Sequence, residues 1–295
     1  MAMWTKETER DFFHWALELQ RCKPQELFYK SGGRYYFYLP VGVKGEGEVK
    51  QARNPLVGRF TEQWAENFLK IIVKDLGLVV VRNKDIPAFG LTGNRAPDLA
   101  ICYKEGEDVI LPENLVAIVE VKMSIVWNWE WDPLSRSVNC IGDFRTHKGR
   151  PSVLRSDNVL KALGKAVEVR GNGYEGLFIV LCNSPISNES LNQIDGWKQT
   201  GIVQGFFSVN PRPLNGQANE KDNPKGTPKG GFLRWDSPEE AKETLQGLVA
   251  NKGLYFSGFL SMETLGRLIE YASRGKNFVE KARLFISELK RHKGE

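Results

Sequence analysis

Two stretches of sequence, Asn94-Arg-Ala-Pro-Asp-Leu-Ala-Ile-Cys-Tyr103 and Leu115-Val-Ala-Ile-Val-Glu-Val-Lys-Met123, decide the fold of this chain. Each contains a strand-length apolar run, and a polar segment, 104–113, connects them. Successive side chains of a strand point to opposite faces, so Glu120 and Lys122 project from the same face of the second strand. Because burying an unpaired charge is costly, two charges on so apolar a strand indicate a specific purpose.

The first of these strands begins with an acidic residue, Asp98, directly after Pro97. An antiparallel pairing of the two strands would bring Asp98 beside Glu120. Two converging carboxylates form a hard-oxygen site that suits Mg²⁺, which takes a few carboxylates and keeps water ligands. The backbone carbonyl of Val121 is a further candidate ligand. Lys122 would then stand beside a metal-bound water, where it could orient that water or stabilise charge on a phosphorane-like transition state.

A simpler interpretation of the same residues is also open. Glu120 and Lys122 could form an exposed ladder on an edge strand, while Asp98 merely starts a strand after a proline turn. The strongly apolar character of 115–123 argues against this interpretation, since an edge strand tolerates more polarity.

The elements predicted around these strands indicate an α/β fold. Apolar periodicity predicts helices, and short apolar runs predict strands. Helices are expected at 5–20, at 60–74 with Thr61 as N-cap, and at 157–170, and strands at 34–39, 78–82, 98–103, 115–122, 177–182 and 203–209. From the first core helix onward, the order helix, strand, strand, strand, helix, strand predicts one sheet flanked by helices.

The chain of 295 residues is long enough for one large domain or two modest ones. A Gly- and Lys-rich segment, 41–54, predicts a mobile loop, and a segment rich in Pro, Gly, Asn and Lys, 210–231, predicts a long loop or linker. The expected regions are an N-terminal elaboration (1–55), a core (56–209) with an insertion at about 124–155, the loop or linker (210–231), and a mostly helical C-terminal region (232–295).

The C-terminal region is predicted to contain helices at 238–250, 262–274 and 277–290. Its apolar positions could form a dimer surface or could pack within the chain. They include Leu265, Leu268, Ile269, Phe278, Leu284 and Phe285.

The residues at the two strands match a known pattern. Pro97-Asp98, twenty-one intervening residues and then Glu120-Val121-Lys122 resemble the motif of the PD-(D/E)XK nuclease superfamily, which includes most type II restriction endonucleases. The resemblance covers roughly 56–185. It implies a restriction-endonuclease-like core with a central mixed β-sheet, in which Asp98 and Glu120 bind Mg²⁺ and Lys122 assists the attacking water.

The resemblance also implies an acidic residue on the helix that precedes the first core strand. Members often carry it in a Gly-x-x-x-Glu setting, which Gly58-Arg-Phe-Thr-Glu62 matches. Glu62 is therefore expected to support the metal directly or through water. Glu66 lies one turn later on the same side of the helix and is the alternative.

A local excess of positive charge follows the second strand. The chain has a net charge of +5, and basic residues gather between Arg136 and Lys165. This excess predicts contacts with DNA phosphates or guanine edges, although a solvated loop and a solvated helix face would explain the same residues. The candidate DNA contacts are Arg145, His147, Lys148, Arg150, Arg155, Lys161 and Lys165.

Three alternating tryptophans, Trp127, Trp129 and Trp131, lie in the predicted insertion. They could stack on bases or wedge into a groove of DNA. The favoured interpretation is a strand packed on the core, because alternating aromatic residues are typical of one.

Several other classes of protein are not indicated by the sequence. It contains no Walker A loop, nucleotide-binding glycine fingerprint or Ser-His-Asp signature, so no nucleotide cofactor is expected. The four cysteines are scattered without metal-ligand spacing, and no signal peptide or membrane-length apolar run is visible. We therefore expect a cytoplasmic protein that is not embedded in a membrane.

These observations together predict a type II restriction endonuclease that hydrolyses double-stranded DNA at a specific sequence with Mg²⁺. Cutting both strands calls for two active sites, so a homodimer is expected. The alternatives are a repair, junction-resolving or phage-type nuclease on the same core, and a non-catalytic DNA-binding protein with this fold.

Overall fold

The computed structural model describes residues 3–45, 53–106, 108–209, 223–250, 260 and 262–293. The chain divides into two compact units, Met1–Tyr255 and Phe256–Glu295. The larger unit contains the two strands on which the sequence analysis is centred. None of the helices in the described ranges combines the length and the apolar character that crossing a bilayer requires.

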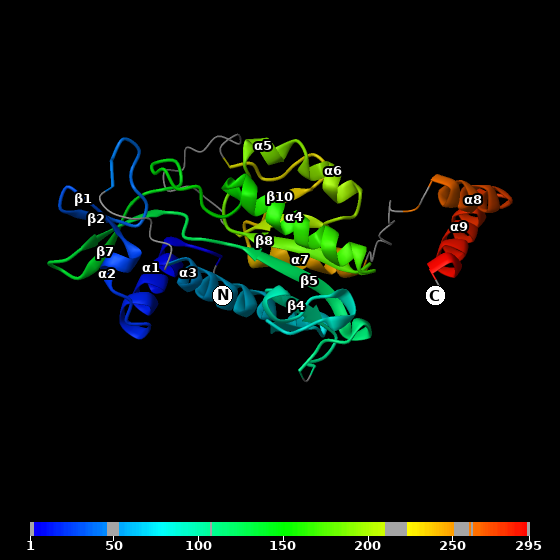
Figure 1. Ribbon diagram of the computed structural model, residues 1–295, viewed down its shortest axis with the longest axis horizontal. Helices are drawn as coiled ribbons and strands as arrows, with labels where there is room; N and C mark the ends of the chain where they lie inside the picture. Colours follow the sequence, from blue (N-terminus) through cyan, green and yellow to red (C-terminus); the bar gives the residue numbers. More distant parts are fainter. Residues whose placement is uncertain are drawn as a thin grey trace. The chain divides into compact units, whose positions relative to one another are not determined.

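A mixed sheet forms the centre of the larger unit (Figure 1), as predicted, and has six strands, of which β10 was not predicted. Its order is β10-β9-β8-β5-β4-β3. The strand bounds are β3 Val79–Arg82, β4 Leu99–Cys102, β5 Leu115–Lys122, β8 Leu177–Cys182, β9 Gly205–Ser208 and β10 Phe232–Arg234. Strands β3, β4 and β5 pair antiparallel, whereas β5, β8, β9 and β10 pair parallel.

The register of β4 on β5 brings the motif together. Leu99 lies opposite Val119 and Ala100 lies opposite Ile118. One step further along the same register, Asp98 comes to the position of Glu120. Strand β5 is central rather than at an edge, so the edge-strand interpretation of Glu120 and Lys122 is wrong.

Helices cover both faces of the sheet, which explains why β5 is apolar on both faces. On one face α3 (Arg53–Val73) and α7 (Pro238–Ala250) share a core with Val119 and Val121. On the other, α4 (Ser156–Gly171) shares a core with Ile118. Because strand residues alternate, Glu120 and Lys122 belong to the α4 face.

Helix α3 begins earlier than the sequence indicated. It starts at Arg53 rather than near Phe60, so the predicted N-cap role of Thr61 is wrong. Thr61 is buried within the helix, and its hydroxyl donates to the carbonyl of Gly58 at 3.0 Å. Pro55 does not prevent the earlier start, because proline is tolerated in the first turn of a helix. The predicted loop 41–54 lies partly in 46–52, outside the described residues.

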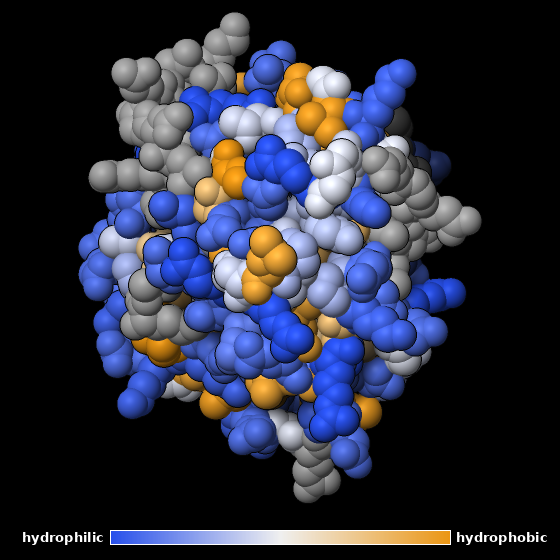
Figure 2. All heavy atoms as spheres, turned by 90° about the vertical axis from the view of Figure 1, so that its left-hand side faces the viewer, coloured by the Kyte–Doolittle hydropathy of each residue, from blue (hydrophilic) through white to orange (hydrophobic). Residues whose placement is uncertain are grey.

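A second, four-stranded sheet joins the N-terminal elaboration to the predicted insertion (Figure 1, left). Its order is β1-β2-β6-β7. The strands are β1 Tyr29–Ser31, β2 Arg34–Tyr36, β6 Asn128–Asp132 and β7 Ser137–Gly142, and the adjacent helices are α1 Lys6–His14, continued by a π-helix at Trp15–Leu19, and α2 Pro24–Leu27. On the face drawn in Figure 2, apolar residues are scattered among hydrophilic ones.

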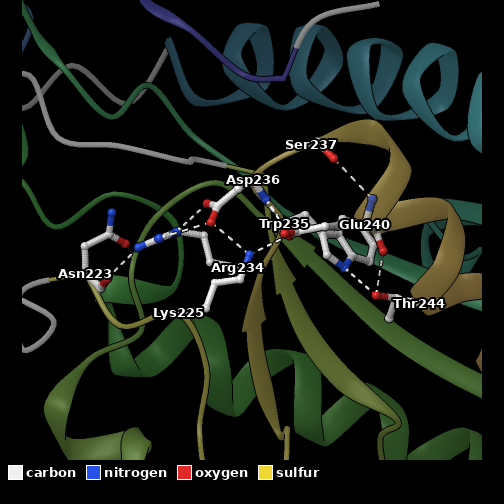
Figure 3. A network of polar contacts seen from close by, with 8 residues as sticks. All are labelled: Asn223, Lys225, Arg234, Trp235, Asp236, Ser237, Glu240 and Thr244. Atoms are coloured by element: carbon white, nitrogen blue, oxygen red, sulfur yellow. Dashed lines mark hydrogen bonds and ion pairs between the residues drawn. The ribbon is translucent and has the colours of Figure 1, made fainter.

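The junction between β10 and α7 belongs to the larger unit, although the sequence analysis placed a boundary at residue 232. Figure 3 shows its polar network. The backbone N–H of Glu240 donates to Ser237 Oγ at 3.3 Å, and the Glu240 carboxylate accepts from the N–H of Asp236 at 2.9 Å. Trp235 Nε1 donates to Thr244 Oγ1 at 3.1 Å. This cap fixes the start of α7 directly after the last strand of the sheet.

Two short helices follow β8, α5 (Asn188–Leu191) and α6 (Ile194–Gln199), and the two helices predicted at 262–274 and 277–290 are present. The smaller unit consists of α8 (Met262–Ser273) and α9 (Phe278–Lys293), which pack against each other. Leu268 is buried in this unit, while Ile269 and Phe278 are exposed.

Candidate active site

The motif residues meet at one end of the β4–β5 pair. Asp98, directly before β4, accepts a hydrogen bond from the backbone N–H of Val121 on its Oδ2 atom at 2.7 Å. This bond orients the Asp98 carboxylate toward the last residues of β5. Glu120 and Lys122 lie on either side of Val121, and Lys122 Nζ donates to Glu120 Oε1.

A second lysine, Lys165 of α4, completes the cluster. Its Nζ atom lies 2.8 Å from Glu120 Oε2 and 4.0 Å from Asp98 Oδ1, and it donates to the carbonyl of Ala96 at 3.2 Å. One ammonium group therefore contacts both carboxylates. The sequence analysis placed Lys165 on a helix face with Lys161 as a DNA contact, whereas in the structure its ammonium group points into the carboxylate pair.

These charges are largely removed from solvent. Glu120 is only 4% exposed, and the side chains of Lys122 and Lys165 are each 18% exposed. Although Lys165 is near, Glu120 Oε2 accepts no aligned hydrogen bond from the described residues. Two largely buried carboxylates that converge in this way fit a small divalent cation, which would take the place of the Lys165 ammonium group beside Glu120 Oε2.

Burial and mutual repulsion change the proton affinity of the site. Burial, reinforced by the charge of Glu120, raises the pKa of Asp98 to about 6, while Lys122 and Lys165 oppose that rise. Burial lowers the pKa of Lys122, but the carboxylates of Glu120 and Asp98 outweigh it and hold the pKa above its ordinary value. Lys122 is therefore protonated at neutral pH and can act as a hydrogen-bond donor and a positive charge.

Glu62 approaches the cluster from α3. Burial raises the pKa of Glu62, whereas Arg82 and a hydrogen bond with Asn83 lower it, and the charges of Lys122 and Glu120 also act on it. Among the described residues, no three His, Cys, Asp or Glu side chains form one metal-binding group. Glu62 is near enough to Lys122 and Glu120 for their charges to act on its pKa. A role through water remains a prediction.

The alternative acidic residue, Glu66, is engaged elsewhere. Its carboxylate pairs with Lys70 at 2.7 Å and with Arg82 at 3.3 Å. These two cations neutralise Glu66, whose side chain is only 12% exposed, so Glu62 is the better placed of the two.

A cleft of about 800 Å³ begins where β5 ends. Met123 and Ser124, the first residues after β5, line it. Four of the predicted DNA contacts line the same cleft: Lys148, Arg150, Arg155 and Lys161. The only acidic residue among the residues that line this cleft, Asp157, pairs with Arg155 at 2.7 Å and with Lys161 at 3.5 Å. Positive charge therefore predominates in the cleft.

The other three candidate contacts lie outside the cleft lining: Lys165, which joins the carboxylate cluster, and Arg145 and His147. Arg145 pairs with Asp143 at 2.7 Å. His147 is buried and stacks on Tyr38 with 4.3 Å between ring centroids, and its Nε2 atom lies 3.1 Å from the carbonyl of Val126. These contacts give His147 a place in the protein interior, where it supports the loop that carries Lys148.

A small polar scaffold joins the cleft to the end of β5. The hydroxyl of Ser152 donates to the carbonyl of Lys122, and Asn183 bonds both backbone groups of Ser124, at 3.0 Å and 2.6 Å. Ser152 has a φ of 52°, a left-handed conformation that is uncommon outside glycine. The local backbone is thus held in an unusual turn between the motif strand and the basic segment.

Sequence reasoning did not find Arg53, which lines the cleft from the start of α3. It fell in the segment predicted as a loop, and no pattern in that segment distinguished it from the neighbouring charges. For Lys165 a signal was present: it follows the buried Ala162 and precedes the buried Ala166 on α4. A lysine beside two core positions is better placed to reach the sheet than to reach solvent.

The tryptophan cluster packs in the core, which is the interpretation that the sequence analysis favoured. Trp127 and Trp129 are buried, and Trp129 Nε1 donates to the carboxylate of Glu9 at 2.8 Å. Trp131 is partly buried and stacks on Phe28 with 6.2 Å between centroids.

Comparisons of the chain with protein-family models, with curated proteins and with solved structures found no match.

Proposed function

We propose that this chain is a Mg²⁺-dependent endonuclease that hydrolyses phosphodiester bonds of double-stranded DNA. The observation that carries the proposal is the convergence of Asp98, Glu120 and Lys122 at the end of β5, beside a basic cleft. The resemblance of these residues to the PD-(D/E)XK motif supports it.

Asp98 and Glu120 would hold the metal, together with the carbonyl of Val121, because their oxygens are the hard ligands that Mg²⁺ prefers. Mg²⁺ bound there would polarise the scissile phosphate and lower the pKa of the attacking water. Lys122 stays protonated and donates a hydrogen bond to the attacking water or to the charge that develops on the phosphate. Glu62 holds a further water near the pair.

The finer proposal is a type II restriction endonuclease in the cytoplasm. A sequence-specific cut through both strands needs two sites of this kind, so the active form is a homodimer. The exposed Ile269 and Phe278 of the smaller unit are candidate contacts between the two copies.

Digestion of a sequenced supercoiled plasmid tests the proposal. The wild-type chain is expected to cut in Mg²⁺ and not in EDTA, and Lys122→Ala is expected to lose roughly a hundredfold or more of the rate. Lys104→Ala, an exposed lysine just beyond β4, serves as the matched control and should cut normally. If Lys122→Ala cuts at the wild-type rate, the proposed active site is wrong.

The same digest separates the alternatives. Discrete, reproducible fragments support restriction, whereas a smear or cutting confined to branched DNA supports a repair or junction-resolving nuclease. Retention of DNA without any cutting in Mg²⁺ would identify a binding protein instead.

A further inference from the structure

A buried arginine in the cleft has no counter-ion among the described residues. Arg53 is 9% exposed, and no described carboxylate forms an ion pair with it. Its Nη1 atom donates to the carbonyls of Leu27, at 3.3 Å, and Phe37. Burial of a cation without an anion is unfavourable, so this arrangement requires an explanation.

Aromatic rings hold the guanidinium of Arg53 in a fixed plane. Its Cζ atom lies 4.3 Å from the ring centroid of Phe37, 5.0 Å from that of Tyr29 and 5.2 Å from that of Tyr38. Cation–π contacts of this kind partly replace the lost hydration. They also orient the guanidinium before any ligand binds.

The hydrogen bonds that Arg53 makes to the described residues use only Nη1, which leaves its Nε and Nη2 donors without a partner among those residues. Among the described residues, the buried polar side-chain atoms without a partner include no nitrogen of Arg53. These donors therefore retain contact with solvent, and the solvent that Arg53 meets is that of the basic cleft, which it lines.

We propose that Arg53 forms a phosphate-binding site in this cleft, which holds one backbone phosphodiester of bound duplex DNA. The inference rests on the proposed function for the identity of the ligand. The planar fork of an arginine matches two phosphate oxygens, and the lysine and arginine residues around it accommodate the phosphates on either side. Ser152, which lines the cleft and bonds the carbonyl of Lys122, links the phosphate site to the motif strand.

Fluorescence anisotropy with a labelled DNA duplex, in Ca²⁺ to suppress cutting, tests the site at several salt concentrations. Arg53→Met should raise Kd about tenfold and lower the slope of log Kd against log salt by roughly 0.9, the value for one lost phosphate contact. Arg53→Lys keeps the charge but loses the fork, so Kd should rise while the slope stays unchanged.

The matched control is Arg59, an exposed arginine on the same helix that lies outside the cleft. Arg59→Met and Arg59→Lys should leave both Kd and the slope at the wild-type values. Thermal melting checks that each variant is folded. If Arg53→Met is unfolded, the Kd of Arg53→Lys is compared with the Kd of Arg59→Lys, and this comparison still tests the phosphate site.

Wild-type Kd and slope in both folded Arg53 variants would overturn the phosphate site, as would the absence of any DNA binding by the wild-type chain. Plasmid cutting by the same proteins is scored separately. A chain that cuts DNA but binds it independently of Arg53 retains the proposed function and loses this inference. A chain that binds through Arg53 without cutting retains the inference.

Discussion

Four charged side chains meet at the end of β5, two carboxylates from Asp98 and Glu120 and two ammonium groups from Lys122 and Lys165. Their formal charges cancel when all four are ionised. A divalent cation that enters this set therefore meets two carboxylates that are already neutralised. Lys165, which reaches both of them from another element, is the obvious competitor for the position of the cation.

Replacement of Lys165 by methionine should therefore strengthen metal binding. The variant leaves a net negative site, and we expect its Kd for Ca²⁺ to fall about tenfold, equivalent to ~1.4 kcal/mol. Isothermal titration calorimetry measures the change. Lys161→Met is the control, because Lys161 is one turn away on α4, 69% exposed and paired with Asp157 instead. An unchanged or weaker affinity in Lys165→Met would show that Lys165 does not compete for the carboxylates.

The pKa of Asp98 gives the metal-free protein a pH-dependent stability. Burial and the charge of Glu120 raise this pKa from 3.8 to about 6, so the folded state binds a proton more tightly than the unfolded state. The stabilising contribution is complete below about pH 4 and is lost as the pH rises through about 6. Asp98→Asn removes the titration, so its free energy of unfolding relative to wild type should rise by roughly 1–3 kcal/mol between pH 4 and pH 7.

Urea denaturation in EDTA at a series of pH values measures this difference. Asp108→Asn, at an exposed position in the connection between β4 and β5, is the control and should track wild type at each pH. A constant offset between Asp98→Asn and wild type across the range would contradict the prediction.

At the scale of elements, Glu9 attaches helix α1 to the chain that leaves β5. Its fully buried carboxylate accepts four N–H groups, from Trp4 and Trp129 side chains and from the backbone of Val126 and Trp127. Burial raises the pKa of Glu9 to about 8, and the four donors oppose that rise. The carboxylate satisfies backbone donors that would otherwise be orphaned between β5 and β6.

Above about pH 8, where Glu9 is ionised, Glu9→Gln should be strongly destabilising. The amide places an NH₂ group against N–H donors and leaves at least one of them unsatisfied in the core, which costs about 2–4 kcal/mol of unfolding free energy. Urea denaturation measures the loss. Asp11→Asn, exposed on the same helix, should stay within about 0.5 kcal/mol of wild type. If the two substitutions change the free energy of unfolding equally, the hydrogen bonds of Glu9 do not contribute to stability as proposed.

The sequence predicted those elements whose apolar pattern is local. Strand β5 is apolar except for Glu120 and Lys122, so its existence and its bounds could be predicted from the sequence. The shared face of Glu120 and Lys122 followed from the alternation of side chains along a strand. The start of α3 was missed because Thr61 resembles an N-cap. In the structure Thr61 lies within the helix, and its buried hydroxyl donates to the carbonyl of Gly58 in the preceding turn.

Other parts of the site depend on tertiary contacts that no local pattern shows. The four-stranded sheet pairs β2 with β6, which are far apart in the sequence. Lys165 reaches the carboxylates only because α4 packs on the face of β5 that carries Glu120. Arg53 enters the cleft only because β1 and β2 bring Tyr29 and Phe37 around its guanidinium. The motif residues could therefore be predicted from the sequence, whereas the positions of Lys165 and Arg53 around them could not.

At the scale of the whole molecule, the chain consists of a large α/β unit and a helical pair, α8 and α9. The pair buries Leu268 and Ala272 but exposes Ile269 and Phe278. These exposed apolar side chains are candidate contacts for the homodimer proposed above.

If α8 and α9 form the dimer contact, Ile269→Asp should weaken association by at least about tenfold, because a charge would be buried at the interface. Sedimentation velocity over a range of concentrations measures the dimer fraction. Glu270→Ala alters the next, exposed position of α8 and should leave the dimer intact. If Ile269→Asp leaves the dimer fraction unchanged, the dimer contact lies in the larger unit instead.

The antiparallel pairing of β4 with β5 also sets the order in which the site assembles as the chain folds. These strands are joined by a short connection, so their pairing closes a small loop, whereas Lys165 arrives only with the crossover from β5 through α4 to β8. Short loops close at the lower entropic cost, and local pairings are expected to form first. Asp98 and Glu120 are therefore expected to meet before Lys165 reaches them. In that case the two carboxylates would be most accessible to a cation before the fold is complete.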